Sequence, residues 1–511
     1  MALSSVASGT LESVPLKPDS TVFAGHDGTR RIRSVVKLQI GGWDARCSSP
    51  TCARAPGSCV IVRSNGISRP ARFGHPAQVI VRAFAGAVAV GTLLLMLPWA
   101  RTGDESAPFS DALFTATSAV CVTGLTTVDT GTYWSPFGQV IILLLIQVGG
   151  LGIMTLATLI VVLLSRRLGM RARLIARTET KSLTRGDVRR VIRNVVLFSL
   201  SVELIIAIAL SARFCLTYDF DLGAGIYQGV FHSISAFNNA GFSTNADSLV
   251  RYNTDPWILL PIAMAVIIGG IGFPVVFELV REWRRPRGWS VLTRITVYTT
   301  AALLVLGTLV YLIAEARNPR TLGPMDDPAK LLNAFFSGVM PRTAGFNSID
   351  IGALGSETTF ATEVLMFIGG GSAGTAGGIK VTTFGLLAFV IWAQMRGETA
   401  VRVGRRQLPA DTERQAVAVA LMSMGIVVTG GFLLMSMTDF DFEAVLFETI
   451  SAFGTVGMTT GITSSLPEPA KYVVTVLMFI GRIGPLTLAT ALAFRGRATR
   501  YQVPEERMIV G

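Results

Sequence analysis

A semi-polar segment that ends in a Gly-centred turn occurs four times in this chain, each time at the same place in a longer unit. Each turn has a Phe ten residues before its Gly, and a second cluster of glycines 24 to 28 residues after it. The turns are Val122-Thr123-Gly124, Asn239-Ala240-Gly241, Thr343-Ala344-Gly345 and Thr455-Val456-Gly457. This shared register indicates one ancestral unit repeated about every 110 residues.

The glycine clusters that follow the turns are similar, with one exception. They are Gly149-Gly150-Leu151-Gly152, Gly269-Gly270-Ile271-Gly272, Gly369-Gly370-Gly371 and Gly481-Arg482-Ile483-Gly484. In the fourth cluster Arg482 stands where the other three clusters have Gly150, Gly270 and Gly370. An arginine inside an apolar segment is costly unless it faces a pore or a carboxylate.

The apolar residues occur in runs of membrane-spanning length. Half of the 511 residues are hydrophobic and 15% are charged, and runs of ~20 residues are long enough to cross the ~30 Å hydrocarbon layer. The net charge of +12 would favour nucleic acid in a soluble domain. Here the arginines concentrate in loops between apolar runs, so the charge indicates topology and no nucleic-acid partner is expected.

Eight crossings and four shorter helices are predicted. The crossings are about 77–99, 136–165, 190–215, 256–282, 291–315, 358–395, 412–437 and 471–495. The shorter helices, each ending at one of the four turns, are about 108–120, 225–237, 328–341 and 441–453. Twelve helical residues reach only ~18 Å, so we expect these segments to enter the membrane and return, as pore helices do.

The arginine-rich links give the orientation. Links at 166–193, 284–287 and 402–406 are rich in arginine, whereas the opposite ends are rich in Asp and Glu. We therefore expect the former to be cytoplasmic. Each unit contains two crossings, so all four units have the same orientation and can surround one axis. The predicted fold is an all-α membrane protein of four parallel M1-pore helix-M2 repeats, with pseudo-fourfold symmetry around one ion pore.

The expected organisation follows these units. It comprises an N-terminal extension (1–75), repeat 1 (76–170), repeat 2 (185–285), repeat 3 with a broken M2 helix (288–397), repeat 4 (408–498) and a C-terminal tail (499–511). The extension lacks an apolar run and is expected to be largely disordered. Its cysteines, Cys47, Cys52 and Cys59, match no zinc or redox spacing.

The four turns have the chemistry of a cation filter. A dehydrated cation in a bilayer needs a dense shell of oxygens, and backbone carbonyls supply one only where the chain leaves helical geometry. Glycine permits the dihedrals that aim successive carbonyls inward, and the helix C-termini add partial negative charge. The alternative is that these are ordinary turns of a membrane bundle. Four turns in one register favour a filter for a monovalent cation.

Two of the turns resemble those of a known family. The stretches 116–125 and 341–347 are similar to the first and third filters of the Trk/Ktr/HKT superfamily of potassium transporters, specifically its KtrB-like membrane subunit. The resemblance covers about residues 75 to 511, including the ending 504–511. In that family, Gly rather than Ser in the first filter goes with potassium over sodium. Because all four filters here carry Gly, the resemblance implies potassium as the transported substrate.

The resemblance also implies partners and a location. It implies a homodimer whose cytoplasmic face binds nucleotide-binding regulatory subunits (KtrA/TrkA-like), while the 166–193 link could instead contact anionic membrane lipids. The expected location is the prokaryotic plasma membrane, multi-pass, with both termini cytoplasmic. No nucleotide is expected on this chain itself, since the GxGxxG-like spacing of Gly369, Gly371 and Gly374 follows no strand.

A glycine-rich run interrupts the long apolar segment of repeat 3. Each Gly costs about 1 kcal/mol of helix stability, so the run is expected to be non-helical below the filter. The resemblance implies that it is the gate, with Arg482 beneath the filter as a barrier to cations. The predicted gate residues are Gly370, Gly371, Ser372, Ala373, Gly374, Thr375, Gly377, Gly378, Lys380 and Arg482. For Lys380 a structural pairing is an equal alternative, and for Arg482 a structural ion pair remains open.

Other charged or polar residues lie in apolar segments. Arg342 and Glu448 are expected to support the filter by packing behind it, and their partners cannot be named from the sequence. Glu203 is ambiguous, and His232 is expected to be a packed residue rather than a ligand. A secondary solute carrier with a midplane substrate site is the alternative function. An enzyme is not expected, because paired carboxylates, His clusters and an activated nucleophile are not evident.

Overall fold

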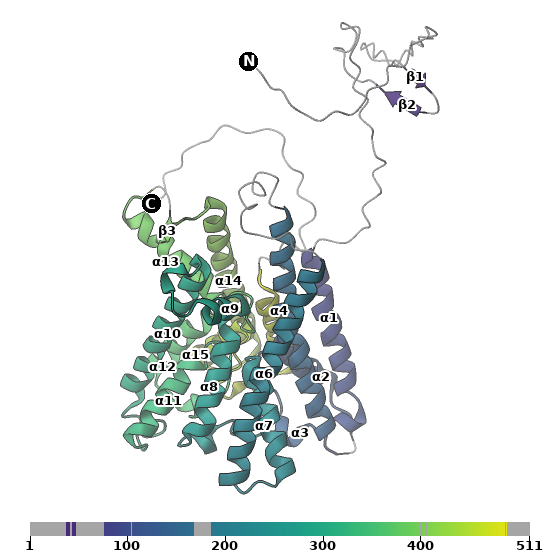
Figure 1. Ribbon diagram of the computed structural model, residues 1–511. Coiled ribbons are helices and arrows are strands. Elements are labelled where there is room, and N and C mark those ends of the chain that lie inside the picture. Colours follow the sequence, from purple (N-terminus) through teal and green to yellow (C-terminus); the bar gives the residue numbers. More distant parts are fainter. Residues whose placement is uncertain are drawn as a thin grey trace. The chain divides into compact units, whose positions relative to one another are not determined.

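The computed structural model describes residues 37–40, 43–46, 76–103, 105–167, 185–398, 401–403, 406–485 and 487. The chain divides into two compact units, residues 1–73 and 74–511, and the described helices belong to the second (Figure 1). In the first unit, β1 (Lys37–Ile40) and β2 (Trp43–Arg46) pair antiparallel, which the sequence did not predict. The rest of the N-terminal extension, residues 168–184 of the arginine-rich link and the predicted tail 499–511 lie outside the described residues.

The second unit contains four successive sets of a long helix, a short helix and a closing helical segment. The leading helices are α1 (Pro76–Leu95), α6 (Arg185–Thr217), α10 (Val291–Glu315) and α14 (Ala410–Met437). The short helices are α2 (Phe109–Cys121), α7 (Leu222–Phe237), α11 (Asp327–Val339) and α15 (Phe442–Gly454), close to the segments expected to be pore helices. The closing segments are α4 (Pro136–Arg167), α8 (Pro256–Ile271) with α9 (Phe273–Glu282), α12 (Ser356–Phe367) with α13 (Val381–Met395), and α16 (Glu468–Ile483).

Short elements complete the described unit. They are α3 (Thr130–Tyr133), the antiparallel pair β3 (Arg402–Val403) and β4 (Arg406–Gln407), and the 3-10 turns η2 (Pro98–Ala100), η4 (Val250–Tyr252), η5 (Pro286–Gly288), η6 (Ile351–Ala353) and η7 (Ile462–Ser465). Among the described residues, α1, α6, α10 and α14 contain stretches long and apolar enough to cross a membrane, and α8 with α9 would be a fifth if counted as one bent span. The eight predicted crossings stay a prediction.

Two closing segments are broken. The sequence predicted one span over 256–282, but the chain bends by 102° between α8 and α9. Gly272 adopts φ +97° at the bend, a region that favours glycine, and Pro274 then starts a new helix because proline fits a first turn. In repeat 3 the predicted non-helical run is present as residues 368–380 between α12 and α13, hereafter the 368–380 loop.

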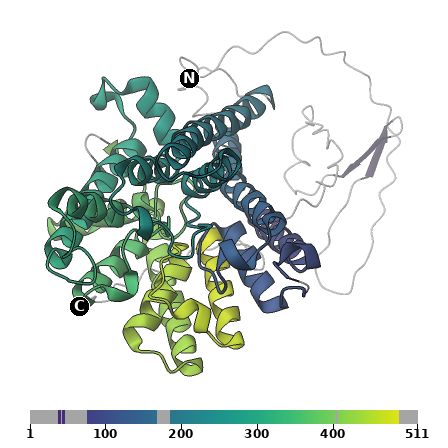
Figure 2. The same cartoon turned by 90° about the horizontal axis from the view of Figure 1, so that it is seen from below.

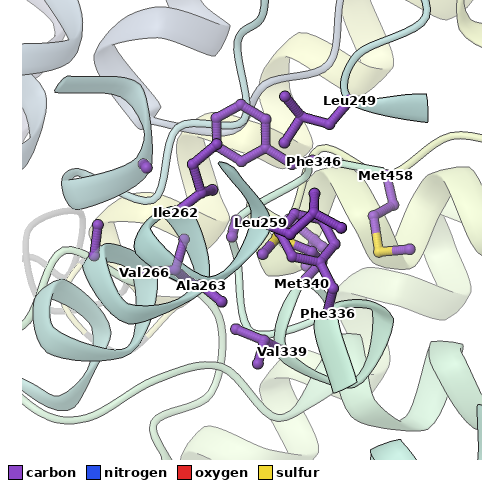
Figure 3. Packing of buried hydrophobic residues seen from close by; sticks show 14 of the residues in the cluster. Leu249, Leu259, Ile262, Ala263, Val266, Phe336, Val339, Met340, Phe346 and Met458 are labelled. Carbon is purple, nitrogen blue, oxygen red and sulfur yellow. The ribbon is translucent and has the colours of Figure 1, made fainter. Parts of the chain in front are cut away.

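Helices from the two ends of the second unit are neighbours. Seen from below, the helices follow one another in a circuit, and the C-terminal helices return beside the N-terminal ones (Figure 2). Consistent with this view, α16 packs against α2. The largest buried cluster contains Leu259 and Ile262 of α8, Phe336 of α11, and Phe346 beyond the third turn (Figure 3). Such close packing, rather than burial from water, is what holds apolar helices together in a bilayer.

Candidate functional site

The four Gly turns share one backbone conformation. In each, the first residue and the Gly have positive φ with an ordinary residue between them. The values are 56° and 93° for Val122 and Gly124, 58° and 70° for Asn239 and Gly241, 71° and 70° for Thr343 and Gly345, and 51° and 90° for Thr455 and Gly457. A β-branched residue with positive φ is strained. Four turns that keep this strain, three of them with Val or Thr, point to a functional constraint on the backbone.

The amides of the turns are occupied by the short helices that precede them. Thr123 N–H donates to the Ser118 carbonyl at 2.8 Å, and Val456 N–H donates to the Ser451 carbonyl at 2.8 Å. The hydroxyls of the same serines accept from the turn glycines, Gly124 at 3.0 Å and Gly457 at 3.2 Å. The second and third turns are tied back by Ala240 N–H to the Ser235 carbonyl at 2.7 Å and Ala344 N–H to the Met340 carbonyl at 3.1 Å.

The carbonyl oxygens of the turns are left available. Within the described part of the chain, no hydrogen bond reaches the carbonyl oxygens of the four residues that precede the glycines. These residues are Thr123, Ala240, Ala344 and Val456. Since buried carbonyls are normally paired, four unpaired carbonyls at equivalent positions are free to bind a ligand.

The four turn glycines contact one another in a closed ring. A Cβ atom on Gly241 would lie 2.6 Å from the Ala344 carbonyl oxygen, and one on Gly345 would lie 2.6 Å from the Val456 oxygen. A Cβ on Gly124 would collide with the Ala240 oxygen, and one on Gly457 with the Thr123 oxygen. Each turn therefore touches the next, and the fourth touches the first. In each turn predicted as filter, the Gly and the residue before it thus lie next to the same two residues of a neighbouring turn.

The second glycine clusters also have a packing reason. A Cβ on Gly149, Gly269 or Gly481 would collide with the backbone oxygen of Val120, Phe237 or Phe453 respectively, in the last residues of the short helix of the same repeat. Glycine at these positions lets the closing helix approach that end. The fixed spacing between turn and cluster thus reflects one helix contact made three times, and repeat 3 differs because its closing segment leaves the helix there.

The 368–380 loop is hydrogen-bonded to the C-terminal end of α8. Gly371 N–H donates to the Gly270 carbonyl at 2.7 Å, and Thr375 N–H donates to the Gly269 carbonyl at 3.2 Å. Because α8 ends at Ile271, these carbonyls have no continuing helix to pair with. The bend between α8 and α9 therefore leaves free the carbonyls that accept hydrogen bonds from the 368–380 loop.

The same loop touches two of the turns and Arg482. The Thr375 hydroxyl donates to Asn239 Oδ1 at 2.8 Å, and a Cβ on Gly377 would collide with the Thr455 side chain. Arg482, 4% exposed, donates to the Thr375 carbonyl and, at 3.2 Å, to the Gly149 carbonyl. No carboxylate of the described residues forms an ion pair with it. Its charge is thus held against carbonyls of the loop and of repeat 1.

Lys380, at the end of the loop, also turns back on it. Its ammonium donates to the carbonyls of Ala376 and, at 3.4 Å, Gly377. The Ser372 hydroxyl lies 2.7 Å from the Thr382 hydroxyl, which fixes the other side of the loop to the start of α13. The predicted gate residues therefore lie together in the 368–380 loop and at Arg482 beside it.

The remaining buried charges have partners that sequence reasoning did not identify. Arg342 donates to the Thr300 carbonyl at 3.3 Å, and the Thr463 hydroxyl donates to the Glu448 carboxylate. The side chain of Gln147 donates to Glu203 at 3.1 Å, and that of Asn238 donates to the same carboxylate at 3.2 Å.

Two further polar contacts lie near the short helices. His232 is fully buried and hydrogen-bonded to the Gln228 carbonyl at 2.9 Å and the Ser243 hydroxyl at 3.1 Å, as a packed residue would be. The sequence analysis also missed an ion pair between Asp111 and Lys471 at 2.8 Å, which joins α2 to α16. Only the lysine's place near the acid-rich side of repeat 4 could have suggested it.

Comparisons with known proteins give matches over most of the chain. The TrkH family model, described as a cation transport protein, matches residues 60–497. The Ktr system potassium uptake protein B of Bacillus subtilis is 42% identical over 436 residues, which cover 85% of this chain and 97% of that protein. The potassium/sodium uptake protein NtpJ of Enterococcus hirae is 34% identical over 443 residues, covering 85% and 97%.

A solved structure shares the fold. The crystal structure of the potassium transporter TrkH from Vibrio parahaemolyticus aligns with a TM-score of 0.66 at 19% identity, covering 84% of this chain and 87% of that one. The resemblance inferred from the turn motifs is confirmed by the family match and by the Ktr relatives. This chain belongs to the TrkH family of cation transport proteins.

Proposed function

We propose that this protein mediates potassium uptake across a prokaryotic plasma membrane through a filter of backbone carbonyls. The observation that carries the proposal is the closed ring of contacts among the four turn glycines, with unpaired carbonyls at equivalent positions. Rings of carbonyl oxygens replace the hydration shell of a potassium ion. The names of the Ktr relatives, which are potassium uptake proteins, support the choice of ion.

The proposed pore is formed by four parallel repeats around one axis. In this arrangement the short helices α2, α7, α11 and α15 point their C-terminal ends, which carry partial negative charge, toward the permeating ion. Their αL-type ends at Val122 and Thr455 turn the chain directly into the filter. No bond is made or broken in the ion's passage, which agrees with relatives that are named as uptake proteins rather than enzymes.

The 368–380 loop is the proposed gate, and Arg482 the proposed barrier below the filter. The loop's hydrogen bonds to α8, Asn239 and Arg482 support this role, because they position irregular backbone against the turns. Irregular backbone at membrane depth is tolerated only where protein or a water-filled cavity surrounds it. Displacement of the loop would require these bonds to break together, as expected of a two-state element.

Regulation is proposed to come from outside the chain. The protein is proposed to form a homodimer with cytoplasmic termini, whose arginine-rich face binds a ring of nucleotide-binding subunits. The exposed Arg402, in one of the arginine-rich links, supports a basic cytoplasmic face.

Growth and flux together test the function. Expression in a bacterial host that lacks potassium uptake should restore growth at low potassium, and purified protein in liposomes should carry potassium without competition from organic solutes. Competition by a solute, or flux that survives distortion of both Gly124 and Gly345, would favour a midplane solute carrier instead. Gly425, whose Cβ position is open, gives the matched control substitution.

A further inference from the structure

Helix α9 departs sharply from the direction of the helix that precedes it. It is turned by 102° from the apolar α8, so it runs along the membrane surface if α8 runs across it. It is short and followed at once by η5 and by α10, the next long apolar helix. It packs against α8 and α10.

The outer face of α9 combines apolar and basic residues. Phe277, Val280 and Trp283 recur every three residues and are 39%, 70% and 65% exposed. Exposed arginines lie beside these residues. The end of α9 and η5, residues 281–288, line an open hollow of about 880 Å³. The arginines of this hollow are Arg281, Arg284, Arg285 and Arg287, hereafter the α9 arginines. An apolar face flanked by arginines is the signature of a helix in the lipid headgroup layer.

The acidic residues of this region do not cancel that charge. The Glu278 carboxylate accepts hydrogen bonds from the hydroxyls of Ser290 at 2.7 Å and Thr293 at 2.5 Å, which ties α9 to the start of α10. Glu282 lies beside the hollow, and its carbonyl accepts from the Trp289 indole at 3.0 Å. Two glutamates therefore accompany four arginines, so the segment keeps a net positive charge, and Glu278 ties its helix to α10.

The inner end of α9 contacts the 368–380 loop. Phe273 N–H, in the first turn of α9, lies 3.4 Å from the Ala373 carbonyl. A Cβ on Gly272 would collide with the Ser372 carbonyl and lie 3.2 Å from the Gly374 nitrogen. Movement of α9 would therefore strain the loop, and restraint of α9 would hold the loop where it is.

We propose that α9 lies in the headgroup layer, where the α9 arginines bind the phosphates of anionic phospholipids and so stabilise the docked loop. The evidence for the lipid site is the exposed face of α9 and the hollow. The expected effect on transport depends in addition on the proposed function, in which the 368–380 loop is the gate. A ligand that binds one arrangement shifts the population toward it. Anionic lipid is thus expected to lower ion flux.

Lipid contact is measured first. The whole protein is placed in phosphatidylcholine nanodiscs that contain brominated phosphatidylglycerol or brominated phosphatidylcholine, and tryptophan quenching is compared. Preferential quenching by the anionic lipid is expected in the native protein and should fall in W283F. The triple variant R284Q/R285Q/R287Q should weaken the preference by about a hundredfold, since each of the three basic residues contributes about 1 kcal/mol at an anionic surface. The variant R396Q/R402Q/R414Q removes as many exposed arginines elsewhere and should keep it.

Flux is measured second, in liposomes without any soluble subunit. Potassium flux should be lower with phosphatidylglycerol than without it, and R284Q/R285Q/R287Q should abolish the difference. Equal quenching by both lipids, or equal loss in the two triple variants, would overturn the lipid site. A triple variant that keeps its lipid response but loses regulation by an added cytoplasmic subunit would overturn it in favour of protein docking. Absence of potassium flux in every lipid would refute the proposed function, while the quenching result would still decide the lipid site.

Discussion

The Thr375 hydroxyl donates a hydrogen bond to Asn239 Oδ1 at 2.8 Å, which links the 368–380 loop to the second Gly turn. The Asn239 side chain also donates to the Arg342 carbonyl at 3.3 Å, next to the third turn. The side chain of Asn239, the first residue of the second turn, therefore bonds both the 368–380 loop and the residue before the third turn. The position of the loop and the geometry of the turns are coupled through Asn239.

Replacing Thr375 with Val should loosen the loop. The change keeps the volume and removes a buried hydrogen bond worth about 1 kcal/mol, so potassium flux in liposomes should rise by about fivefold, and Thr375→Ser should restore it. Thr429→Val is the control, because the Thr429 hydroxyl bonds only within α14. Unchanged flux in a folded Thr375→Val protein would mean that this bond does not hold the loop closed.

Replacing Gly124 with Ser should reduce the preference for potassium over sodium. Gly124 has φ +93°, and a side chain there would collide with the Ala240 carbonyl oxygen, so the carbonyl ring must widen or tilt. The measurement is potassium flux at varied sodium. Gly86→Ser, in a helix where the Cβ position is open, should leave selectivity unchanged. A Gly124→Ser protein that folds and still excludes sodium would count against the filter.

Local patterns predicted the helices and the turns, but not the contacts between distant parts of the chain. The glycine at each turn and the run at 369–378 disfavour helix by themselves, so their positions follow from the sequence. The bend at Gly272 had a local signal in Pro274, but an unbroken apolar run concealed it.

Partners of the buried charges could not be predicted, because they depend on the packing of different repeats. Arg482 meets a carbonyl 107 residues away, and Asp111 pairs with a lysine 360 residues away. The Gly269 and Gly270 carbonyls, likewise, accept from amides of the 368–380 loop only because α8 stops at Ile271. Such groups become acceptors through tertiary structure rather than through residue type, so no motif marks them.

Replacing Gly481 with Ala should destabilise the protein. The added methyl would collide with the Phe453 carbonyl at the end of α15, and overpacking of this kind costs about 1–3 kcal/mol. A thermal melt in detergent should show a lower Tm than for Gly425→Ala, which has open space and gains helix propensity. Equal Tm values would show that α16 can move away from the short helix without loss.

Replacing Arg482 with Ala should raise potassium flux. The change removes a positive charge held against Thr375 and Gly149 carbonyls, and a barrier lowered by about 1.4 kcal/mol corresponds to a tenfold higher rate. Arg482→Lys keeps the charge but not the two-armed geometry, and should retain most of the barrier. Equal flux in the Ala and Lys variants would assign Arg482 a role in holding the loop rather than in repelling the ion.

The ion pair between Asp111 and Lys471 should stabilise the contact between the first and last repeats. Its atoms lie 2.8 Å apart, and the two side chains are 13% and 15% exposed. The Thr127 hydroxyl adds a bond to the same carboxylate at 2.9 Å. Removal of one partner from a buried pair is costly because the other charge remains, so Asp111→Asn and Lys471→Met should each lower stability by about 1–3 kcal/mol.

A double-mutant cycle on thermal or denaturant unfolding isolates this interaction. The double variant Asp111→Asn/Lys471→Met should lose less than the sum of the single variants, with a coupling of about 1–2 kcal/mol. The pair Asp247–Arg251 is the control, because it lies within one turn of chain and its side chains are 37% and 49% exposed, so its coupling should be below about 1 kcal/mol. Additive losses at Asp111 and Lys471 would show that apolar packing of α2 on α16, not this charge pair, closes the circuit of repeats.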